Sequence, residues 1–383
     1  MVEFDFYNPV HFIFGRGKLA KIGSLTRQYG KKVLIVTSGS TARTGVLAKV
    51  IGYAKEAGLE YAVFDKVTAN PLTTTVYAGA KVACDEHCDV VIGIGGGSAM
   101  DAAKAIAFMA RNSGDITAYM DGAPGAGALP IILVATTAGT GSEGNMGAVV
   151  TDQATNDKRP LKTQYIYPKA SIIDPELFRT LSKRQIAGPG LDALYHSIES
   201  YIGNRCNPVT EMIALQAITL LARHLPAVYD DADDIAAWEK VALASTLSGV
   251  VIGFSGTCLP HGLEHPVSGL FNVAHGEGLA AVFLQVMEFA HRNAPERFAA
   301  IARAMGVNTG GMSPEEAAAA SIEAVAKLME RMNMTPKLRD LGVTKEDLDW
   351  LTANALKTGK ANIENTPRVP DAKEIRELYL QCL

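Results

Sequence analysis

The first half of the chain, to about residue 180, alternates short runs of β-branched residues with longer stretches of helical periodicity, and this alternation limits the possible folds more than any other feature of the sequence. The expected strands are apolar along their whole length, as are strands with both faces buried. Strand–helix–strand order with such strands predicts an α/β domain in which helices cover both faces of a parallel sheet. The expected strands are Lys32–Thr37, Tyr61–Val67, Asp89–Ile94 and Pro130–Ala135, with shorter candidates at Ala148–Thr151 and Ser171–Ile173.

After about Leu181 the pattern changes to helical periodicity rich in Ala and Leu, with few β-branched runs. A chain of 383 residues is long enough for two domains with separate cores. We therefore expect an α/β domain over residues 1–182 and an all-helical domain over residues 183–383. The longest mostly apolar run, Ala242–Leu259, contains Ser, Thr and Gly, and it fits a buried core helix better than a membrane span.

Composition excludes several classes of partner. The chain is 48% hydrophobic and 20% charged, with a formal net charge of −4 and with Lys and Arg scattered along its length. Nucleic acid and anionic membranes attract clustered positive charge, so neither is an expected partner, and a small molecule is. The five cysteines are odd in number and widely spread, which favours reduced thiols. The N-terminus lacks the pattern of a signal peptide, so a cytoplasmic location is expected.

Glycines follow one of the expected strands directly. The segment GIGGGS, residues 93–98, places Gly95, Gly96, Gly97 and Ser98 between a buried strand and a helix that is expected to begin near Ser98. Glycines allow backbone amides to approach an anion closely, and a helix N-terminus adds unpaired N–H groups. The segment therefore predicts a pyrophosphate site, although a turn needed only for packing is the alternative. It lacks the third glycine of the G-x-G-x-x-G fingerprint.

A second loop rich in Gly, Ser and Thr follows the strand at Pro130–Ala135 and contains Thr136, Thr140 and Ser142. Open α/β sheets bind ligands at the carboxyl ends of their strands, so two such loops at one edge support each other. A nucleotide cofactor is the expected ligand.

Histidines and one aspartate gather in the second half. Asp192 and His196 lie four residues apart in a helical pattern, so both side chains project from one face. His261 and His265 repeat this spacing, and His275 follows. A carboxylate with three neutral imidazoles suits Zn²⁺ or Fe²⁺ and leaves room for a substrate oxygen, while ordinary core or surface histidines are the alternative. The other histidines are expected at the surface: His11, His87, His224 and His291.

Taken together, these motifs resemble the iron-containing (group III) alcohol dehydrogenase family over nearly the whole chain. The matching motifs occur in the family's order: GGGS with Asp101 and Lys104, TTAGTGSE at 136–143, Asp192-x-x-x-His196, and His261-x-x-x-His265 followed by His275-Gly276. The resemblance implies an α/β dinucleotide-binding domain, a helical domain and an active site in the cleft between them. It also implies an NAD(P)-linked alcohol dehydrogenase or aldehyde reductase that acts on small primary alcohols or aldehydes and forms a homodimer or larger assembly.

The resemblance also assigns roles. It places the metal ligands at Asp192, His196, His261 and His275, and it places His265 near the nicotinamide as a candidate proton relay. It places cofactor contacts at Asn70, Gly96, Gly97, Ser98, Asp101, Thr137 and Lys158. Substrate-pocket candidates are Phe254, Cys258 and Phe271.

Within the family, the segments around Gly141–Asn145 and His275–Ala280 look most like the butanol dehydrogenase and broad-range aldehyde reductase branch. Many NAD-dependent members carry an Asp after the first strand, where this chain has Ser38, Gly39 and Ser40. A carboxylate there would repel a 2′-phosphate, so its absence permits NADP and gives a lean toward it, with NAD as the alternative. Other readings are a glycerol dehydrogenase-like or dehydroquinate synthase-like enzyme of the same fold, or a non-catalytic nucleotide-binding protein.

Overall fold

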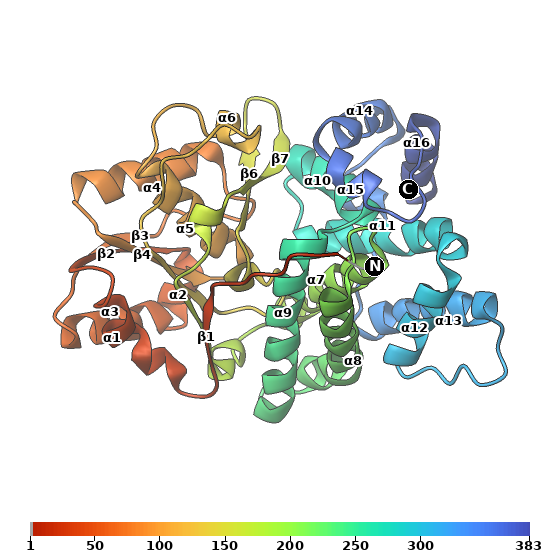
Figure 1. Ribbon diagram of the computed structural model, residues 1–383, viewed down its shortest axis with the longest axis horizontal. Helices are drawn as coiled ribbons and strands as arrows, with labels where there is room; N and C mark the ends of the chain where they lie inside the picture. Colours follow the sequence, from red (N-terminus) through yellow and green to blue (C-terminus); the bar gives the residue numbers. More distant parts are fainter. Residues whose placement is uncertain (1–2) are drawn as a thin grey trace. The chain divides into compact units, whose positions relative to one another are not determined.

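The structure is a computed structural model that describes residues 3–383. It divides into two compact units: an α/β unit, Tyr7–Thr180, and a helical unit formed by Leu181–Leu383 together with the residues up to Phe6 (Figure 1). The division at Thr180 lies two residues from the boundary expected from the sequence. The attachment of the N-terminal residues to the helical unit was not anticipated.

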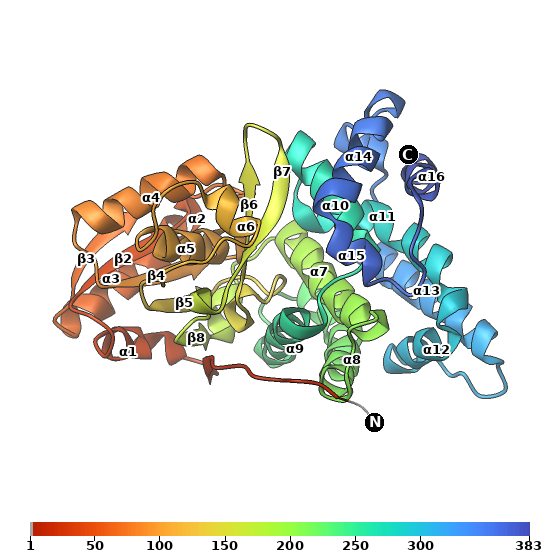
Figure 2. The ribbon, with the colours of Figure 1, turned by 45° about the horizontal axis from the view of Figure 1, so that its top comes forward.

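The α/β unit is built on a six-stranded parallel sheet with the order β1-β8-β5-β4-β2-β3 (Figure 2). Its strands are β1 (His11–Phe14), β2 (Lys32–Thr37), β3 (Glu60–Phe64), β4 (Val90–Gly95), β5 (Ile131–Ala135) and β8 (Ala170–Ile173). Its helices are α1 (Ile22–Thr26), α2 (Gly39–Arg43), α3 (Val46–Glu56), α4 (Thr73–Asp85), α5 (Gly97–Met109) and α6 (Ile116–Met120). The expected α/β fold with a parallel sheet is confirmed.

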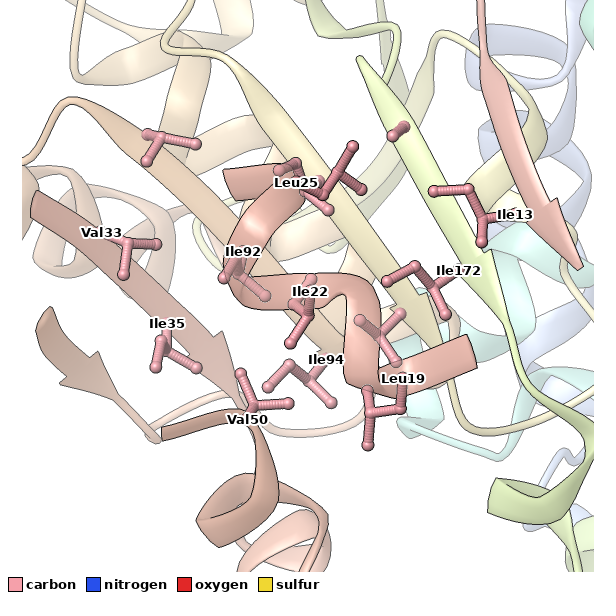
Figure 3. Close-up of a cluster of buried hydrophobic side chains, with 14 of the residues drawn as sticks. Ile13, Leu19, Ile22, Leu25, Val33, Ile35, Val50, Ile92, Ile94 and Ile172 are labelled. Atoms are coloured by element: carbon pink, nitrogen blue, oxygen red, sulfur yellow. The ribbon is translucent and has the colours of Figure 1, made fainter. Parts of the chain in front are cut away.

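Both faces of the sheet are buried, as the apolar strands predict. On one face, side chains of the strands pack against α1 and α3, as Figure 3 shows for Ile92, Ile22 and Val50. On the other face α5 lies so close to β4 that a Cβ on Gly93 would come within 2.6 Å of the Ala103 Cβ. This close approach explains the glycine inside a buried strand.

Two β features differ from the expectation. The edge strand β1 was missed, because its four residues show little apolar alternation. The candidate at Ala148–Thr151 is part of β6 (Gly147–Asp152), which does not join the main sheet but pairs with β7 (Asp157–Lys162) in an antiparallel hairpin. The polar sequence of β7, DKRPLK, gave no strand signal.

The chain order of the strands reverses between β2 and β4, which are neighbours in the sheet although β3 lies between them in sequence. Parallel sheets bind ligands at such a switch point, outside the carboxyl ends of the strands. The segments that begin there are Ser38–Ser40 after β2 and Gly96–Ser98 after β4.

The helical unit contains α7 (Lys183–Ile202), α8 (Pro208–Asp230), α9 (Ile235–Ser255), α10 (Leu259–Phe271), α11 (His275–Ala290), α12 (Pro295–Ala304), α13 (Pro314–Arg331), α14 (Leu348–Thr358), α15 (Lys360–Glu364) and α16 (Ala372–Gln381). By length and composition α8 and α9 could cross a membrane, but 61% of the apolar window of α9 is buried within the protein. Burial to this extent agrees with the core helix expected at Ala242–Leu259 as far as Ser255, where α9 ends; Leu259 already begins α10. An apolar cluster of α10, α11, α14 and α16 residues fixes the two helices that carry the later histidines.

Candidate metal centre and cofactor loops

Helix α7 supplies the first two predicted metal ligands. A capping box formed by Ser182 and Gln185 fixes its start. Asp192 and His196 then lie one turn apart with side chains 3% and 6% exposed, and the Asp192 Oδ1 to His196 Nε2 distance is 3.4 Å. The i, i+4 spacing therefore does what the sequence predicted and brings both side chains to one buried point.

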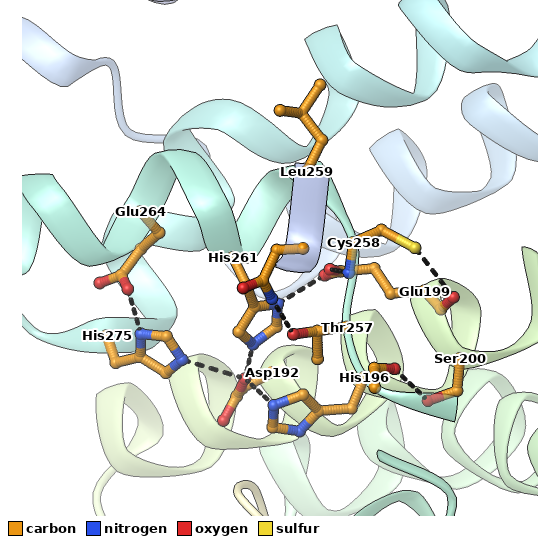
Figure 4. A network of polar contacts seen from close by, with 12 residues as sticks. Asp192, His196, Glu199, Ser200, Thr257, Cys258, Leu259, His261, Glu264 and His275 are labelled. Atoms are coloured by element: carbon orange, nitrogen blue, oxygen red, sulfur yellow. Dashed lines mark hydrogen bonds and ion pairs between the residues drawn. The ribbon is translucent and has the colours of Figure 1, made fainter. Parts of the chain in front are cut away.

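Helices α10 and α11 bring two histidines to the same oxygen. The Nε2 atoms of His261 and His275 lie 3.8 and 3.7 Å from Asp192 Oδ1 (Figure 4). Helix α11 begins at His275, and its start is held close to α7, because a Cβ on Gly276 would lie 2.4 Å from the Gly188 carbonyl oxygen. One donor atom each from Asp192, His196, His261 and His275 lies within 4.8 Å of the others.

These four residues fit a divalent cation. Metal–ligand bonds of roughly 2.0–2.2 Å place the ligands of a tetrahedral ion roughly 3.3–3.6 Å apart, close to the separations found here. The Nε2 atom of His261 is buried and has no hydrogen-bond partner among residues 3–383, as expected of an atom that donates its lone pair to an ion. Three buried carboxylates, Asp192, Glu199 and Glu264, surround the imidazoles, and such charges need a compensating cation.

Two of the three imidazoles have a carboxylate behind them. His261 Nδ1 donates to Glu199 Oε1 at 2.7 Å, and His275 Nδ1 lies 2.5 Å from Glu264 Oε2. A proton held on Nδ1 leaves the Nε2 lone pair available, so each carboxylate favours the tautomer that binds a metal. The second oxygen of Glu199 accepts the backbone N–H of Cys258 at 2.6 Å, and Glu264 also accepts the hydroxyl of Ser268.

The charge of Glu199 also acts on His261. Burial by itself lowers the pKa of His261, but the carboxylates of Glu199, Asp192 and Glu264 together outweigh this effect, and the pKa is raised above its ordinary value. The negative environment therefore favours a positive partner at this ring, whether a proton or a metal ion.

His265 stands apart from the four ligands. It lies on α10 one turn after His261 and is 9% exposed, with its ring centroid 6.0 Å from that of His261 and 5.7 Å from that of His275. One possible ligand atom each of His265, Glu264 and His275 also lies within 4.8 Å of the others. The grouping around Asp192 is favoured, because Glu264 holds His275 through Nδ1 and the Nε2 atom of His275 faces Asp192.

The two predicted cofactor loops of the α/β unit lie side by side. Thr136 donates its backbone N–H to the Gly95 carbonyl at 2.9 Å. Cβ atoms on Gly96 and Gly97 would lie 2.8 Å from Thr137 Oγ1 and 2.3 Å from Thr140 Cγ2. Helix α5 begins at Gly97, so the amides that a helix leaves unpaired belong to this turn. The close approach of the two loops therefore accounts for the glycines at 96 and 97, and the turn has the form of an anion-binding site.

Other predicted cofactor residues lie in the turn after β2, before α4 and on β7. Ser38 occupies the N-cap position of the short helix α2 without a side-chain capping bond, and its hydroxyl lies 2.8 Å from that of Ser40. Asn70 has a positive φ of 48° and precedes a segment that bridges to Thr151 of β6, and Thr151 pairs with Lys158 of β7. Asn70 and Lys158 are therefore brought toward each other, while both are mostly buried.

Two predicted cofactor contacts, Asp101 and Ser142, make hydrogen bonds within the protein. Asp101 Oδ1 accepts the Ser142 hydroxyl at 2.5 Å and Asp101 Oδ2 accepts the Val149 N–H at 2.9 Å. Ser142 is 3% exposed and its hydroxyl also accepts from Lys104. These bonds occupy both side chains within the protein, which gives them a structural place that the sequence did not indicate.

The three predicted substrate-pocket residues lie in different surroundings. Cys258 is fully buried and its thiol faces the backbone carbonyls of Glu199 and Asn365. Phe271 lies 13 residues further along, about 20 Å at the helical rise, and packs on the apolar cluster of α10 and α14. Phe254 stacks on Phe6 with ring centroids 4.1 Å apart. The assignment of Phe254, Cys258 and Phe271 to the substrate pocket stays a prediction.

One further expectation is corrected. His291 is not a surface residue: it is 5% exposed, and its ring packs edge-on against Phe298. Its Nδ1 lies 2.9 Å from the Glu288 carbonyl oxygen.

The sequence reasoning missed Glu199 and Glu264. Their spacing carried a signal, because Glu199 lies seven residues after Asp192 and Glu264 three after His261, positions that share a helix face with the ligands. A carboxylate on the buried face of a helix needs a partner, and imidazole N–H groups were the partners at hand.

Three imidazoles beside one carboxylate form a donor set for a Lewis-acidic metal, and the loops at the sheet edge are those of dinucleotide-binding proteins. Fold and site thus define a metal-dependent dehydrogenase. The comparisons agree: residues 9–175 match the profile of the iron-containing alcohol dehydrogenases, and residues 186–383 match the profile of the C-terminal part of the Fe-containing alcohol dehydrogenase family.

Individual relatives extend over the full chain. A 1,3-propanediol dehydrogenase of Citrobacter freundii is 36% identical over 99% of this chain and 98% of its own. An NAD-dependent methanol dehydrogenase of Bacillus methanolicus is 34% identical over 99% of this chain and 100% of its own. A solved 1,3-propanediol oxidoreductase superposes with a TM-score of 0.95 at 34% identity, covering 100% of both chains.

The chain belongs to the iron-containing alcohol dehydrogenase family. It is an oxidoreductase that acts on CH–OH donors and interconverts alcohols with aldehydes.

Proposed function

We propose that this enzyme transfers a hydride between NAD(P)H and a small primary alcohol or aldehyde, with Fe²⁺ or Zn²⁺ held by Asp192, His196, His261 and His275. The observation that carries the proposal is the convergence of four donor atoms from three helices within 4.8 Å of one another. Relatives that act on methanol and on 1,3-propanediol support a small substrate. The narrower resemblance to butanol dehydrogenases and aldehyde reductases stays a prediction.

When bound, the metal supplies a Lewis acid that polarises the substrate carbonyl, and the nicotinamide supplies or accepts the hydride. The residues of this chain bind and orient these groups. Asp192 and the three histidines hold the ion, Glu199 and Glu264 keep two of the imidazoles in the binding tautomer, and the glycine turn after β4 binds the pyrophosphate.

Alcohol oxidation also releases a proton, and we assign its transfer to His265. It is the one imidazole of the cluster that the four-ligand site leaves unused, and it lies within one helical turn of His261. A neutral imidazole accepts the hydroxyl proton in alcohol oxidation, and an imidazolium returns it in aldehyde reduction.

The choice between NAD and NADP rests on the turn after β2. Ser38, Gly39 and Ser40 offer hydroxyl and amide groups without a carboxylate, and a Cβ on Gly39 would lie 3.5 Å from an Arg43 guanidinium nitrogen. A 2′-phosphate could be accommodated there, which supports NADP weakly. The NAD dependence of the methanol dehydrogenase relative supports NAD.

The competing functions gain no support from the site. A non-catalytic nucleotide-binding protein needs no buried set of four ligands, and the methanol and 1,3-propanediol dehydrogenase relatives are alcohol dehydrogenases. A homodimer or larger assembly and a cytoplasmic location are part of the proposal. All five cysteines are free in the described chain, as a reducing compartment requires.

A substrate panel tests the proposal. Purified enzyme of known metal content is assayed with methanol, 1-butanol, 1,3-propanediol, glycerol and the matching aldehydes, with each of NAD(H) and NADP(H). We expect metal-dependent turnover of small primary alcohols and aldehydes, abolished by a chelator and restored by Fe²⁺ or Zn²⁺. Turnover of none of them with metal bound would contradict it, and turnover of glycerol alone would favour the glycerol dehydrogenase alternative.

A further inference from the structure

Lys104 is a buried lysine that the chemistry described so far does not use. It lies on α5 with 0% of its surface exposed. Its ammonium contacts four oxygens: the Ser142 carbonyl at 2.5 Å, the Ser142 hydroxyl at 2.8 Å, the Gly147 carbonyl at 2.8 Å and Asn145 Oδ1 at 3.3 Å. All four belong to the segment Ser142–Gly147, which leads from the second cofactor loop into β6.

Asp101, one turn earlier on α5, holds the same segment. Its carboxylate accepts the Ser142 hydroxyl and the Val149 N–H, so the Ser142 hydroxyl donates to Asp101 and accepts from Lys104. We refer to Asp101, Lys104, Ser142 and Asn145 as the clasp. It ties the body of α5, whose first turn carries Gly97 and Ser98, to the loop Thr136–Ser142.

The first turn of α5 packs tightly against the second cofactor loop. A Cβ on Gly97 would lie 2.3 Å from Thr140 Cγ2, so the first turn of α5 and the second loop are in contact too close for any side chain at position 97. Burial of an ammonium costs free energy unless hydrogen bonds and counter-charges compensate it. A methionine of similar length would avoid that cost, yet would leave the oxygens of the segment without their donor.

We propose that Lys104 and Asp101 are positioning residues that hold the loop Thr136–Ser142 against α5 and so preform the pyrophosphate site, without contacting the cofactor themselves. The proposal rests on the proposed binding of NAD(P) at this edge of the sheet. It assigns Asp101 and Ser142 to the support of the site in place of direct contact.

Because Lys104 can lose its proton, the proposal also predicts that cofactor affinity depends on pH. Burial lowers the pKa of Lys104 to about 8, while the carboxylates of Asp101 and Glu143 oppose the shift. The charged groups that act on the clasp are Asp101 on α5, Glu143 after β5 and Lys158 on β7. A neutral amine has two N–H donors where the ammonium has three, so the clasp loses a hydrogen bond above this pH.

The test measures NADH and NADPH affinity by fluorescence on full-length enzyme as wild type, Lys104→Met and Ser142→Ala. The matched control is Lys81→Met, which removes an exposed lysine paired only with Asp85 on α4 of the same unit. We expect Lys104→Met to weaken cofactor binding by roughly tenfold or more, equivalent to about 1.4 kcal/mol. Ser142→Ala should weaken it by a smaller factor, and Lys81→Met should leave it unchanged.

Three further readouts separate positioning from general damage. The metal affinity of Lys104→Met should equal that of wild type, and its kcat at saturating cofactor should fall far less than kcat/KM for the cofactor. Wild-type affinity should decrease as pH rises through about 8, whereas Lys104→Met should show no such decrease. If Lys104→Met does not fold, Ser142→Ala and the wild-type pH profile decide.

Cofactor affinity within twofold of wild type in folded Lys104→Met would overturn the inference, as would a flat wild-type profile together with an unaffected Ser142→Ala. Failure of the proposed function looks different, because wild type itself would then bind neither NADH nor NADPH.

Discussion

Glu199 and Glu264, the two carboxylates that contact the metal-site histidines, differ in how many of their hydrogen bonds a glutamine could keep. Glu199 uses each oxygen for a separate N–H donor, His261 Nδ1 and the Cys258 backbone. A glutamine has one acceptor oxygen, so in Glu199→Gln one of these donors meets an NH₂ group. The backbone amide of Cys258 always carries its proton, whereas the proton of a neutral His261 imidazole can move from Nδ1 to Nε2. The variant therefore favours His261 with its proton on Nε2, the tautomer that cannot bind a metal.

At Glu264 the partners are His275 Nδ1 and the Ser268 hydroxyl. A hydroxyl can accept as well as donate, so the NH₂ of Glu264→Gln can donate to Ser268 while the oxygen still accepts from His275. Changes behind metal-binding histidines cost roughly 10–100-fold in affinity, or about 1.4–2.7 kcal/mol. We expect Glu199→Gln near the upper end of this range and Glu264→Gln near the lower end.

The assay is competition for Zn²⁺ against a chromophoric chelator, with folding checked by circular dichroism. Glu364→Gln, which alters an exposed carboxylate 3.8 Å from Lys360, is the matched control and should bind metal as wild type does. Equal affinities in wild type and Glu199→Gln would refute the tautomer argument. A larger loss in Glu264→Gln than in Glu199→Gln would refute the count of acceptors on which the ranking rests.

Three other changes test separate parts of the account. Gly276→Ala should weaken metal binding by roughly tenfold with every ligand retained, because its Cβ would meet the Gly188 carbonyl oxygen at 2.4 Å. The control Gly52→Ala, in open space on α3, should leave metal binding unchanged. Unchanged binding in Gly276→Ala would mean that the α7–α11 junction adapts freely. His265→Ala should keep its metal while kcat falls by roughly 10²–10⁴, and loss of metal would make His265 a ligand. Ser38→Asp should shift the NADP-to-NAD ratio of kcat/KM by roughly tenfold or more toward NAD, since a like charge at ~4 Å costs about 1–4 kcal/mol, and an unchanged ratio would place the 2′ position elsewhere.

Local sequence patterns were sufficient to predict those features that depend on a single strand or helix. The apolar run Lys32–Thr37 coincides with β2, and the i, i+4 pair of Asp192 and His196 converges as its spacing requires. The two glycine loops meet because the strands before them, β4 and β5, are neighbours in a parallel sheet.

What the sequence did not show depends on contacts between distant segments. The inward orientation of Asp101 results from Ser142 and Val149, about 40 and 50 residues away, and periodicity says nothing about such partners. The edge strand β1 needs β8, which lies about 160 residues later, to supply its hydrogen bonds. Cys258 is buried as its residue type predicts, but the backbone carbonyls that its thiol faces could not be read from the sequence.

Metal content and turnover, measured together on the same samples, test the central assignment most directly. Elemental analysis should find one divalent ion per chain in wild type and in His265→Ala, and a much lower content in His261→Ala and His275→Ala. Alcohol oxidation should be nearly absent from the last two and should not return when cofactor is added in excess. Stoichiometric metal with full turnover in either His261→Ala or His275→Ala would contradict the four-ligand site.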